Sequence, residues 1–206
     1  VDQEGASAYS AHTDGPILLA DRGVHLEEAE RIARQGFEAV PEAVREDSMF
    51  VDTEEEFYRR MRWGRALVHD ALGWVYFQQG RLDSAEARLE RADSLFDDGN
   101  RQNLYHLGKL HAELGRPDEA EQYHAAGLRA GGMGENPNLA ALESLYRQRH
   151  GDLDGYDRYV ANLKETVKAK KREEILAQRI EDPRMLSSFA MERSEEHTSE
   201  LQSPSA

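Results

Sequence analysis

Residues 71–85 read ALGWVYFQQGRLDSA, and residues 106–120 read HLGKLHAELGRPDEA. The two stretches align without a gap. Small residues recur at three aligned positions with a constant offset of 35 residues: Gly73, Gly80 and Ala85 in the first stretch, and Gly108, Gly115 and Ala120 in the second. A fixed period in this range is typical of solenoids, in which similar units stack on one another.

Each stretch has the pattern of two helices joined by a tight turn. Gly80 and Gly115 end the first helix, where a left-handed backbone conformation favours glycine. Asp83 and Asp118 then fall in the first turn of the second helix, where the helix dipole favours anions. Gly73 lies inside an apolar helical run, at a cost of about 1 kcal/mol relative to alanine. We therefore expect the second helix of the same unit to approach closely at this position.

This pattern resembles the tetratricopeptide repeat, a helix–turn–helix unit of about 34 residues. The resemblance implies an all-α fold, a tetratricopeptide-type helix-turn-helix solenoid of three to four repeats. We assign three repeats to residues 66–100, 101–135 and 136–163. The repeats and a long C-terminal capping helix, which we expect to cover the last repeat, together occupy residues 66–181.

The third repeat departs from the pattern. Asn136 and Pro137 are typical of a helix start, and we expect the second helix of this repeat to begin near Asp152. Tyr156 stands where the family has a small residue, so we expect the two helices to splay. Asp182-Pro183 predicts the end of the long last helix, because the residue before a proline disfavours the helical conformation.

A partial repeat precedes the others and occupies residues 1–40, in which Ala29, Ala33 and Gly36 follow the pattern of a second helix. The offset from Ala29 to Ala85 exceeds one repeat by about 21 residues, which indicates an insertion of roughly residues 41–61.

We assign residues 41–65 to the insertion and to the start of a long helix. Thr53 and Glu56 have the spacing of a capping box, in which each side chain binds the other residue's backbone N–H group. The helix that begins there is expected to run from about Glu54 to Gln79, into the first full repeat.

Both ends of the chain need separate interpretation, because neither fits the predicted repeats. The chain begins with Val1, which suggests processing or excision from a longer reading frame. Residues 193–203 resemble the translation of a sequencing-adapter oligonucleotide, and the alternative is a natural polar tail. We therefore assign residues 193–206 to a non-native disordered tail, and residues 182–192 to a linker or the start of a lost domain.

The composition argues against several classes of function. There is no cysteine, which excludes disulfides, thiolate metal sites and cysteine nucleophiles. A net charge of −14 argues against a nucleic-acid partner, and no stretch approaches the ~20 apolar residues of a membrane span. Motifs for phosphate loops, zinc proteases and serine hydrolases are missing as well. We predict no catalytic residues and no cofactor for this chain, and leave its compartment open between cytoplasm and periplasm.

Two of the eight histidines are candidates for chemistry. His111 and His124 fall at the inward aromatic positions of the second repeat, where we expect them to face each other. They would form either a metal pair or a pH-sensitive contact, or else they replace aromatic residues in the packing. We favour packing and predict no metal site, because the sequence suggests no third ligand.

The resemblance also implies a partner-binding groove, lined by the first helices of the repeats. Its positions map here to Asp70, Trp74, Phe77, Gln78, Tyr105, His106, Lys109, Glu113, Arg147 and Gln148. Trp74, Phe77 and Tyr105 would form an exposed aromatic patch that anchors a partner, unless Trp74 and Phe77 pack against the long inserted helix instead. One subfamily clamps C-terminal carboxylates in this groove, but its clamp positions hold Asp70, Trp74 and His106 here, so such tails are poor candidate ligands.

The expected function is a protein–protein interaction or scaffold module that binds an unidentified protein or peptide in this groove. The alternative is an accessory repeat region of a larger, truncated bacterial protein. In that case residues 188–192 begin a thioredoxin-like domain. A weaker third interpretation is a scaffold that self-associates through the uncapped face of its N-terminal repeat.

Overall fold

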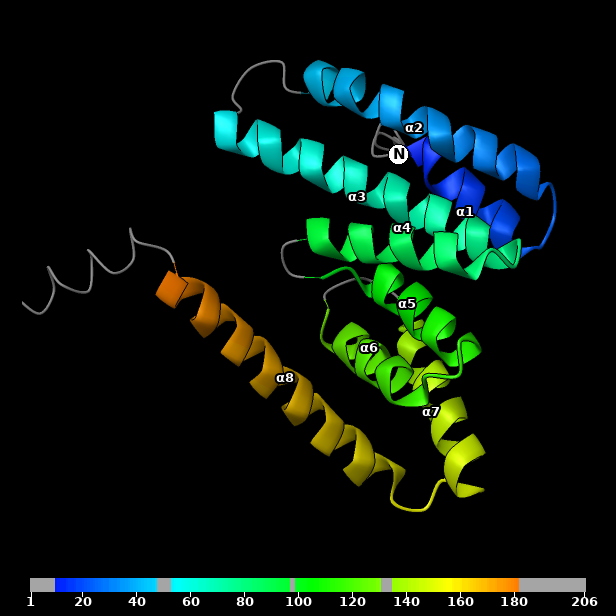
Figure 1. Ribbon diagram of the computed structural model, residues 1–206, viewed down its shortest axis with the longest axis vertical. Helices are drawn as coiled ribbons and strands as arrows, with labels where there is room; N and C mark the ends of the chain where they lie inside the picture. The colour runs from blue at the N-terminus through cyan, green and yellow to red at the C-terminus, as the bar shows by residue number, and fades with distance from the viewer. Residues whose placement is uncertain (1–9, 48–52, 97–98, 131–134, 182–206) are drawn as a thin grey trace, which may run out of the picture. The chain divides into compact units, whose positions relative to one another are not determined.

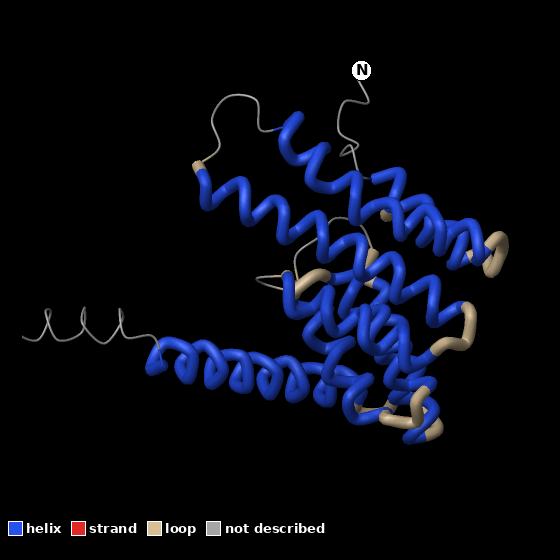
Figure 2. The backbone as a smooth tube through the Cα atoms, turned by 45° about the horizontal axis from the view of Figure 1, so that its top comes forward, coloured by secondary structure: helices blue, strands red, loops and turns tan. Residues whose placement is uncertain are grey.

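The computed structural model describes residues 10–47, 53–96, 99–130 and 135–181. In these ranges the chain forms one short 3-10 helix and eight α-helices, with no strand (Figures 1 and 2). The chain divides into two units, Val1–Val160 and Ala161–Ala206. The linker or lost domain, the thioredoxin-like start and the adapter-like tail were all assigned to residues 182–206, which lie outside the described residues.

The first unit contains α1 (Asp14–Asp21), α2 (Leu26–Asp47), α3 (Glu54–Gln78), α4 (Leu82–Leu95), α5 (Arg101–Glu113), α6 (Pro117–Arg129), α7 (Pro137–His150) and the first residues of α8 (Tyr156–Glu181). The helices α1 to α7 follow one another as antiparallel neighbours (Figure 1). From α1 to α7, each helix contacts the next, and α1, α3, α5 and α7 also contact one another in turn. This arrangement confirms the predicted all-α solenoid.

The predicted turns and caps are present. Gly80 and Gly115 follow the first helices of two repeats, each with a φ of 72°. Asn136 caps α7 through its side chain, which accepts a hydrogen bond from the backbone N–H of Asn138. Pro117 begins α6, where its missing N–H leaves no intrahelical hydrogen bond unmade.

Two helical glycines allow each repeat to close, as predicted for Gly73. A Cβ atom at Gly73 would lie 2.7 Å from Cγ of Leu89 in α4. At Gly108, a Cβ atom would overlap the imidazole of His124 in α6. The two contacts occupy equivalent positions in successive repeats, so the 35-residue period extends to the side chain that packs on each glycine.

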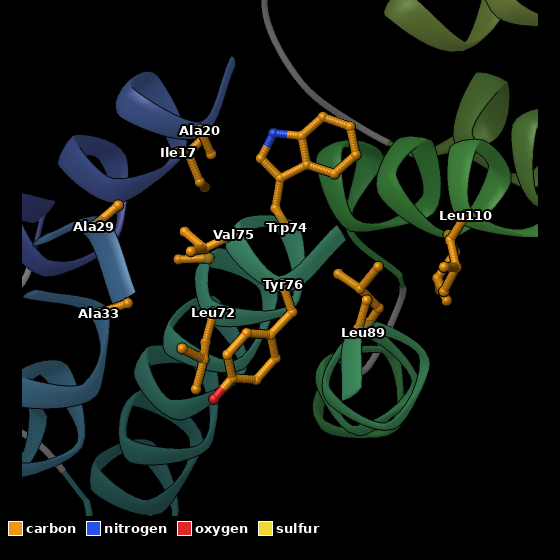
Figure 3. Close-up of a cluster of buried hydrophobic side chains, with 13 residues drawn as sticks. Ile17, Ala20, Ala29, Ala33, Leu72, Trp74, Val75, Tyr76, Leu89 and Leu110 are labelled. Carbon is orange, nitrogen blue, oxygen red and sulfur yellow. The ribbon is translucent and has the colours of Figure 1, made fainter. Parts of the chain in front are cut away.

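A single cluster of buried side chains passes through the first five helices (Figure 3). It includes Ile17 and Ala20 of α1, Ala29 and Ala33 of α2, Leu72, Trp74, Val75 and Tyr76 of α3, Leu89 of α4 and Leu110 of α5. The partial N-terminal repeat and the first two full repeats therefore share one continuous core. This continuity is what stacked units need, because no single helix pair buries its own apolar face.

The residues assigned to an insertion lengthen two helices. α2 continues through Pro41 to Asp47, and α3 begins after the predicted capping box of Thr53 and Glu56. Val40 and Val44 of α2 are buried against Val68 of α3. This apolar contact offsets the backbone hydrogen bond that Pro41 cannot donate within the helix.

The third repeat differs from the prediction at its turn. α8 begins at Tyr156 and not near Asp152, because residues 151–155 form a turn in which Asp152 Oδ1 accepts a hydrogen bond from the backbone N–H of Asp154. The Tyr146 ring lies 5.3 Å from the Tyr156 ring and 4.9 Å from the Tyr159 ring, centroid to centroid. Tyrosine rings thus occupy the contact where the other repeats place a small residue.

The described part of the second unit, residues 161–181, continues α8. The helix is described as far as Glu181, and the stop predicted at Asp182-Pro183 lies outside the described residues. Its surface is charged, with Lys168 Nζ 3.5 Å from a carboxylate oxygen of Glu165. The capping role expected for this helix stays a prediction.

Candidate functional site

A groove of about 1150 Å³ follows the first helices of the repeats. Eight of the ten predicted groove residues line it. They are Trp74, Phe77 and Gln78 from α3, Tyr105, His106, Lys109 and Glu113 from α5, and Gln148 from α7. The structure therefore brings these side chains together, while their role in binding stays a prediction.

Trp74 forms the buried floor of this groove. Its side chain is 4% exposed and lies between two nearly parallel rings, Phe77 at 4.8 Å and His106 at 4.1 Å between centroids. The indole Nε1 donates a 2.7 Å hydrogen bond to Oδ1 of Asp21 at the end of α1. Figure 3 shows the indole nitrogen turned toward the helix that carries Ile17 and Ala20.

The expectation of an exposed Trp74 is therefore wrong, and so is the alternative that the inserted helix covers it. The covering element is α1, whose Asp21 receives the indole N–H group. Phe77 and Tyr105 remain partly exposed on the wall of the groove. The accessible aromatic surface thus consists of these two rings, and Trp74 supports them from below.

Asp70 lies behind the groove wall and not in it. Its side chain is buried, and its Oδ1 atom lies 3.0 Å from Nδ1 of His106. The same oxygen accepts a 2.9 Å hydrogen bond from Nδ2 of Asn103. Asp70 therefore holds His106 in place against Trp74, which is a positioning role that the groove assignment did not foresee.

The charged groove residues lie at the rim. Lys109 and Glu113 are exposed on successive turns of α5. Arg147 is not among the lining residues, and its guanidinium lies 3.0 Å from a carboxylate oxygen of Glu143 on the same helix. The pKa of Tyr105 is raised, first by burial and then by the charge of Asp21, so its hydroxyl stays a neutral hydrogen-bond donor.

Several groove residues were missed by the sequence prediction, including Asp21, Arg101, Glu135 and Pro137. For Asp21 a signal existed, because the offset that aligns Ala29 with Ala85 also aligns Asp21 with the groove residue Phe77. The others precede or begin the first helices, where the repeat pattern carries no distinctive residue.

The two candidate histidines contact different residues. Nδ1 of His124 lies 2.9 Å from Oδ1 of Asn138 in α7, and its pKa is lowered by burial despite this hydrogen bond. The His111 ring lies 4.9 Å from the ring of Tyr123. For His124 the packing interpretation fits, because its imidazole fills the space that Gly108 leaves open.

Comparisons with known proteins agree with the repeat pattern. A family model described as tetratricopeptide repeat matches residues 65–91 and 104–122, which belong to the first two full repeats. This match confirms the tetratricopeptide assignment for these two repeats. No curated protein and no solved structure matches the chain. Among the helices that the structure describes, none combines the length and the apolar character needed to cross a lipid bilayer.

Proposed function

We propose that this chain, which carries tetratricopeptide repeats, acts as an interaction or scaffold module that binds a peptide segment of a partner protein in the groove of α3, α5 and α7. Such repeats generally serve as protein-interaction modules and are typically not enzymes. The observation that carries the proposal is the aromatic wall of the groove, where Phe77 and Tyr105 stand on the buried Trp74–His106 stack.

The support beneath these rings favours binding. Asp21 holds the indole of Trp74, and Asp70 holds the imidazole of His106. Rings that are fixed before a partner arrives lose little conformational entropy when it binds. Aromatic side chains in such settings contribute a large share of the binding energy at protein interfaces. Phe77 and Tyr105 are therefore the expected anchors.

The charges of the groove narrow the class of ligand. Asp21, Glu113 and Glu135 line it together with Arg101 and Lys109, so acidic groups are in slight excess. This balance disfavours an anionic C-terminal tail. We expect a segment that inserts an apolar side chain between Phe77 and Tyr105 and carries no net negative charge.

The experiment begins with peptides selected from a random library on the purified chain. Affinities are then compared for the chain and for the variants Phe77→Ala and Tyr105→Ala, by fluorescence anisotropy. Each variant should weaken binding by about 10-fold or more, as expected for a hot-spot residue. Helical content measured by circular dichroism should stay near that of the unaltered chain, since both rings are partly exposed.

Tyr58→Ala is the matched control. Tyr58 is 62% exposed, lies at the other end of α3 and does not line the groove. Its loss should leave peptide affinity unchanged. Peptides that bind Phe77→Ala and Tyr105→Ala as tightly as the unaltered chain would show that the groove is not the binding site.

A further inference from the structure

Three potential metal ligands from two neighbouring repeats meet outside the groove. Glu86 and Glu90 lie one turn apart on α4, and His111 faces them from α5. One oxygen of each carboxylate and one ring nitrogen of His111 all lie within 4.8 Å of one another. None of the three residues lines the partner groove.

His111 itself lacks the hydrogen bonds that a buried imidazole needs. The residue is only 5% exposed, and among the described residues neither Nδ1 nor Nε2 has a hydrogen-bond partner. Buried polar groups are almost always paired, so an orphaned ring that faces two carboxylates indicates that an ion or a water belongs between them.

The surrounding charges favour a cation at this position. Negative charges near the imidazole of His111 favour a positive charge there, and they belong to Glu86, Glu90 and Glu119. The positive charge of Arg116 opposes this effect. Arg116 forms an ion pair with Glu86, at the edge of the cluster.

Tyr123 packs beside His111 and also lies near acidic side chains. Its pKa is raised to about 12, first by burial and then by nearby acidic residues that include Asp93, Glu90 and Glu86. Its ring lies 4.9 Å from that of His111, so the two side chains share one acidic environment.

We propose that Glu86, Glu90 and His111 bind a divalent transition-metal ion of the Zn²⁺ type, with water completing its coordination. A set of one imidazole and two carboxylates suits such ions, whereas Mg²⁺ and Ca²⁺ prefer oxygen ligands alone. Tetrahedral zinc with bonds of about 2.0–2.2 Å keeps its ligand atoms roughly 3.4 Å apart. The exposed side chain of Glu90 can rotate inward to reach this spacing.

The bound ion would connect the second helix of the first full repeat to the first helix of the next. Its effect on the fold follows from mass action, because an ion that binds only the folded chain stabilises it. At about 100 times the dissociation constant, the unfolding temperature should rise by roughly 5–10 °C for a chain of this length.

The test uses the full chain and the metal alone. Zn²⁺ affinity is measured by isothermal titration calorimetry, and Co²⁺ serves as a spectroscopic probe, since its visible absorption reports the coordination geometry. Glu90→Gln should weaken Zn²⁺ binding by about 10-fold or more. This exposed substitution removes one ligand and leaves the core intact. His111→Gln should abolish the Co²⁺ spectrum.

Two further variants separate the site from general surface binding. Arg116→Gln frees Glu86 from its ion pair, so Zn²⁺ affinity should increase. His150→Gln removes an exposed imidazole elsewhere and should change nothing. The proposal is overturned if the unaltered chain shows neither heat of binding nor thermal shift, if Glu90→Gln binds Zn²⁺ as tightly as the unaltered chain, or if His150→Gln causes the larger loss. These tests remain decisive even if His111→Gln fails to fold.

Discussion

The indole of Trp74 and the imidazole of His106 lie face to face, with 4.1 Å between ring centroids and 11° between ring planes. The two residues belong to successive repeats, and the stack joins α3 to α5 beneath the groove. His106 keeps this orientation through its contact with Asp70. Stability of the module and shape of its groove therefore depend on the same buried contact.

Replacing Asp70 should destabilise the fold strongly. Asp70→Ala leaves Nδ1 of His106 and Nδ2 of Asn103 without this acceptor inside the core, at an expected cost of about 2–4 kcal/mol. Urea denaturation followed by circular dichroism measures the free energy of unfolding. Asp83→Ala, at an exposed position, is the comparison. A loss at Asp70 no larger than the loss at Asp83 would contradict the buried anchoring role.

The close approach at Gly108 predicts a second effect. Gly108→Ala places a methyl group against the ring of His124, and the resulting overpacking should lower stability by about 1–3 kcal/mol. The same substitution at Gly15 of α1, where the added methyl meets no atom within 4 Å apart from its chain neighbours and the nearby backbone of its own helix, should be neutral or stabilise by up to about 1 kcal/mol. Equal thermal unfolding temperatures for the two variants would contradict the close approach.

Glu30 of α2 connects its own helix to the turn between α3 and α4 through its carboxylate. It accepts hydrogen bonds from Arg34 at 2.7 Å and from Gln79 at 3.2 Å, and lies 3.0 Å from Arg81. Because both arginines are partly exposed, Glu30→Ala should cost only about 1 kcal/mol.

The exposed pair of Glu28 and Arg31 on the same helix provides the control for Glu30. Glu28→Ala should cost less than Glu30→Ala in the same urea experiment, because solvent screens this exposed ion pair. A larger loss at Glu28 than at Glu30 would show that the connection to the turn between α3 and α4 contributes nothing.

His69 predicts a dependence of stability on pH. Burial, followed by the charges of Arg88, Arg91 and Arg65, lowers its pKa from 6.5 to about 4. Below pH 6.5 the unfolded chain binds a proton that the folded chain refuses until about pH 4, so stability should fall as the pH falls through this window.

The variant His69→Gln removes this contribution of His69 to the pH dependence of stability. Its free energy of unfolding should change less between pH 6.5 and pH 4 than that of the unaltered chain. Nuclear magnetic resonance titration of the ring gives the pKa directly, and a value near 6.5 would refute the prediction. Nδ1 of His69 lies 3.3 Å from Nη1 of Arg88, a donor, which fits a neutral ring.

The repeat period predicted the helices and turns because it reflects contacts inside each helix pair. Gly80 and Gly115 mark turns that depend on the local backbone, and Gly73 marks the contact between the two helices of one repeat. The continuation of α2 through Pro41 was not predicted, and the helix start near Asp152 was predicted wrongly. At Pro41, the valines that pack α2 onto α3 outweigh a local helix-breaking signal. At Asp152, a side chain binds the backbone of its own turn and delays the helix.

The site was harder to predict, because exposure depends on contacts between elements. Trp74 occupies a groove position, yet α1 covers it through Asp21, a residue of the shortened N-terminal repeat. The grouping of His111 with Glu86 and Glu90 was missed for the same reason. Nothing distinguishes these two carboxylates among the 40 acidic residues of the sequence until α4 and α5 are packed together.

The buried asparagines give the stack a fixed register. Asn103 and Asn138 are one repeat period apart, and both are fully buried. Nδ2 of Asn103 donates hydrogen bonds to Asp70 and to the backbone oxygen of Leu89. Oδ1 of Asn138 lies 2.9 Å from Nδ1 of His124, and Nδ2 of Asn138 donates a hydrogen bond to the backbone oxygen of Arg101. An apolar interface tolerates sliding by a helical turn, but these directional bonds do not. These hydrogen bonds fix the position of each repeat relative to the next. The spacing of the groove residues is therefore set before any partner binds.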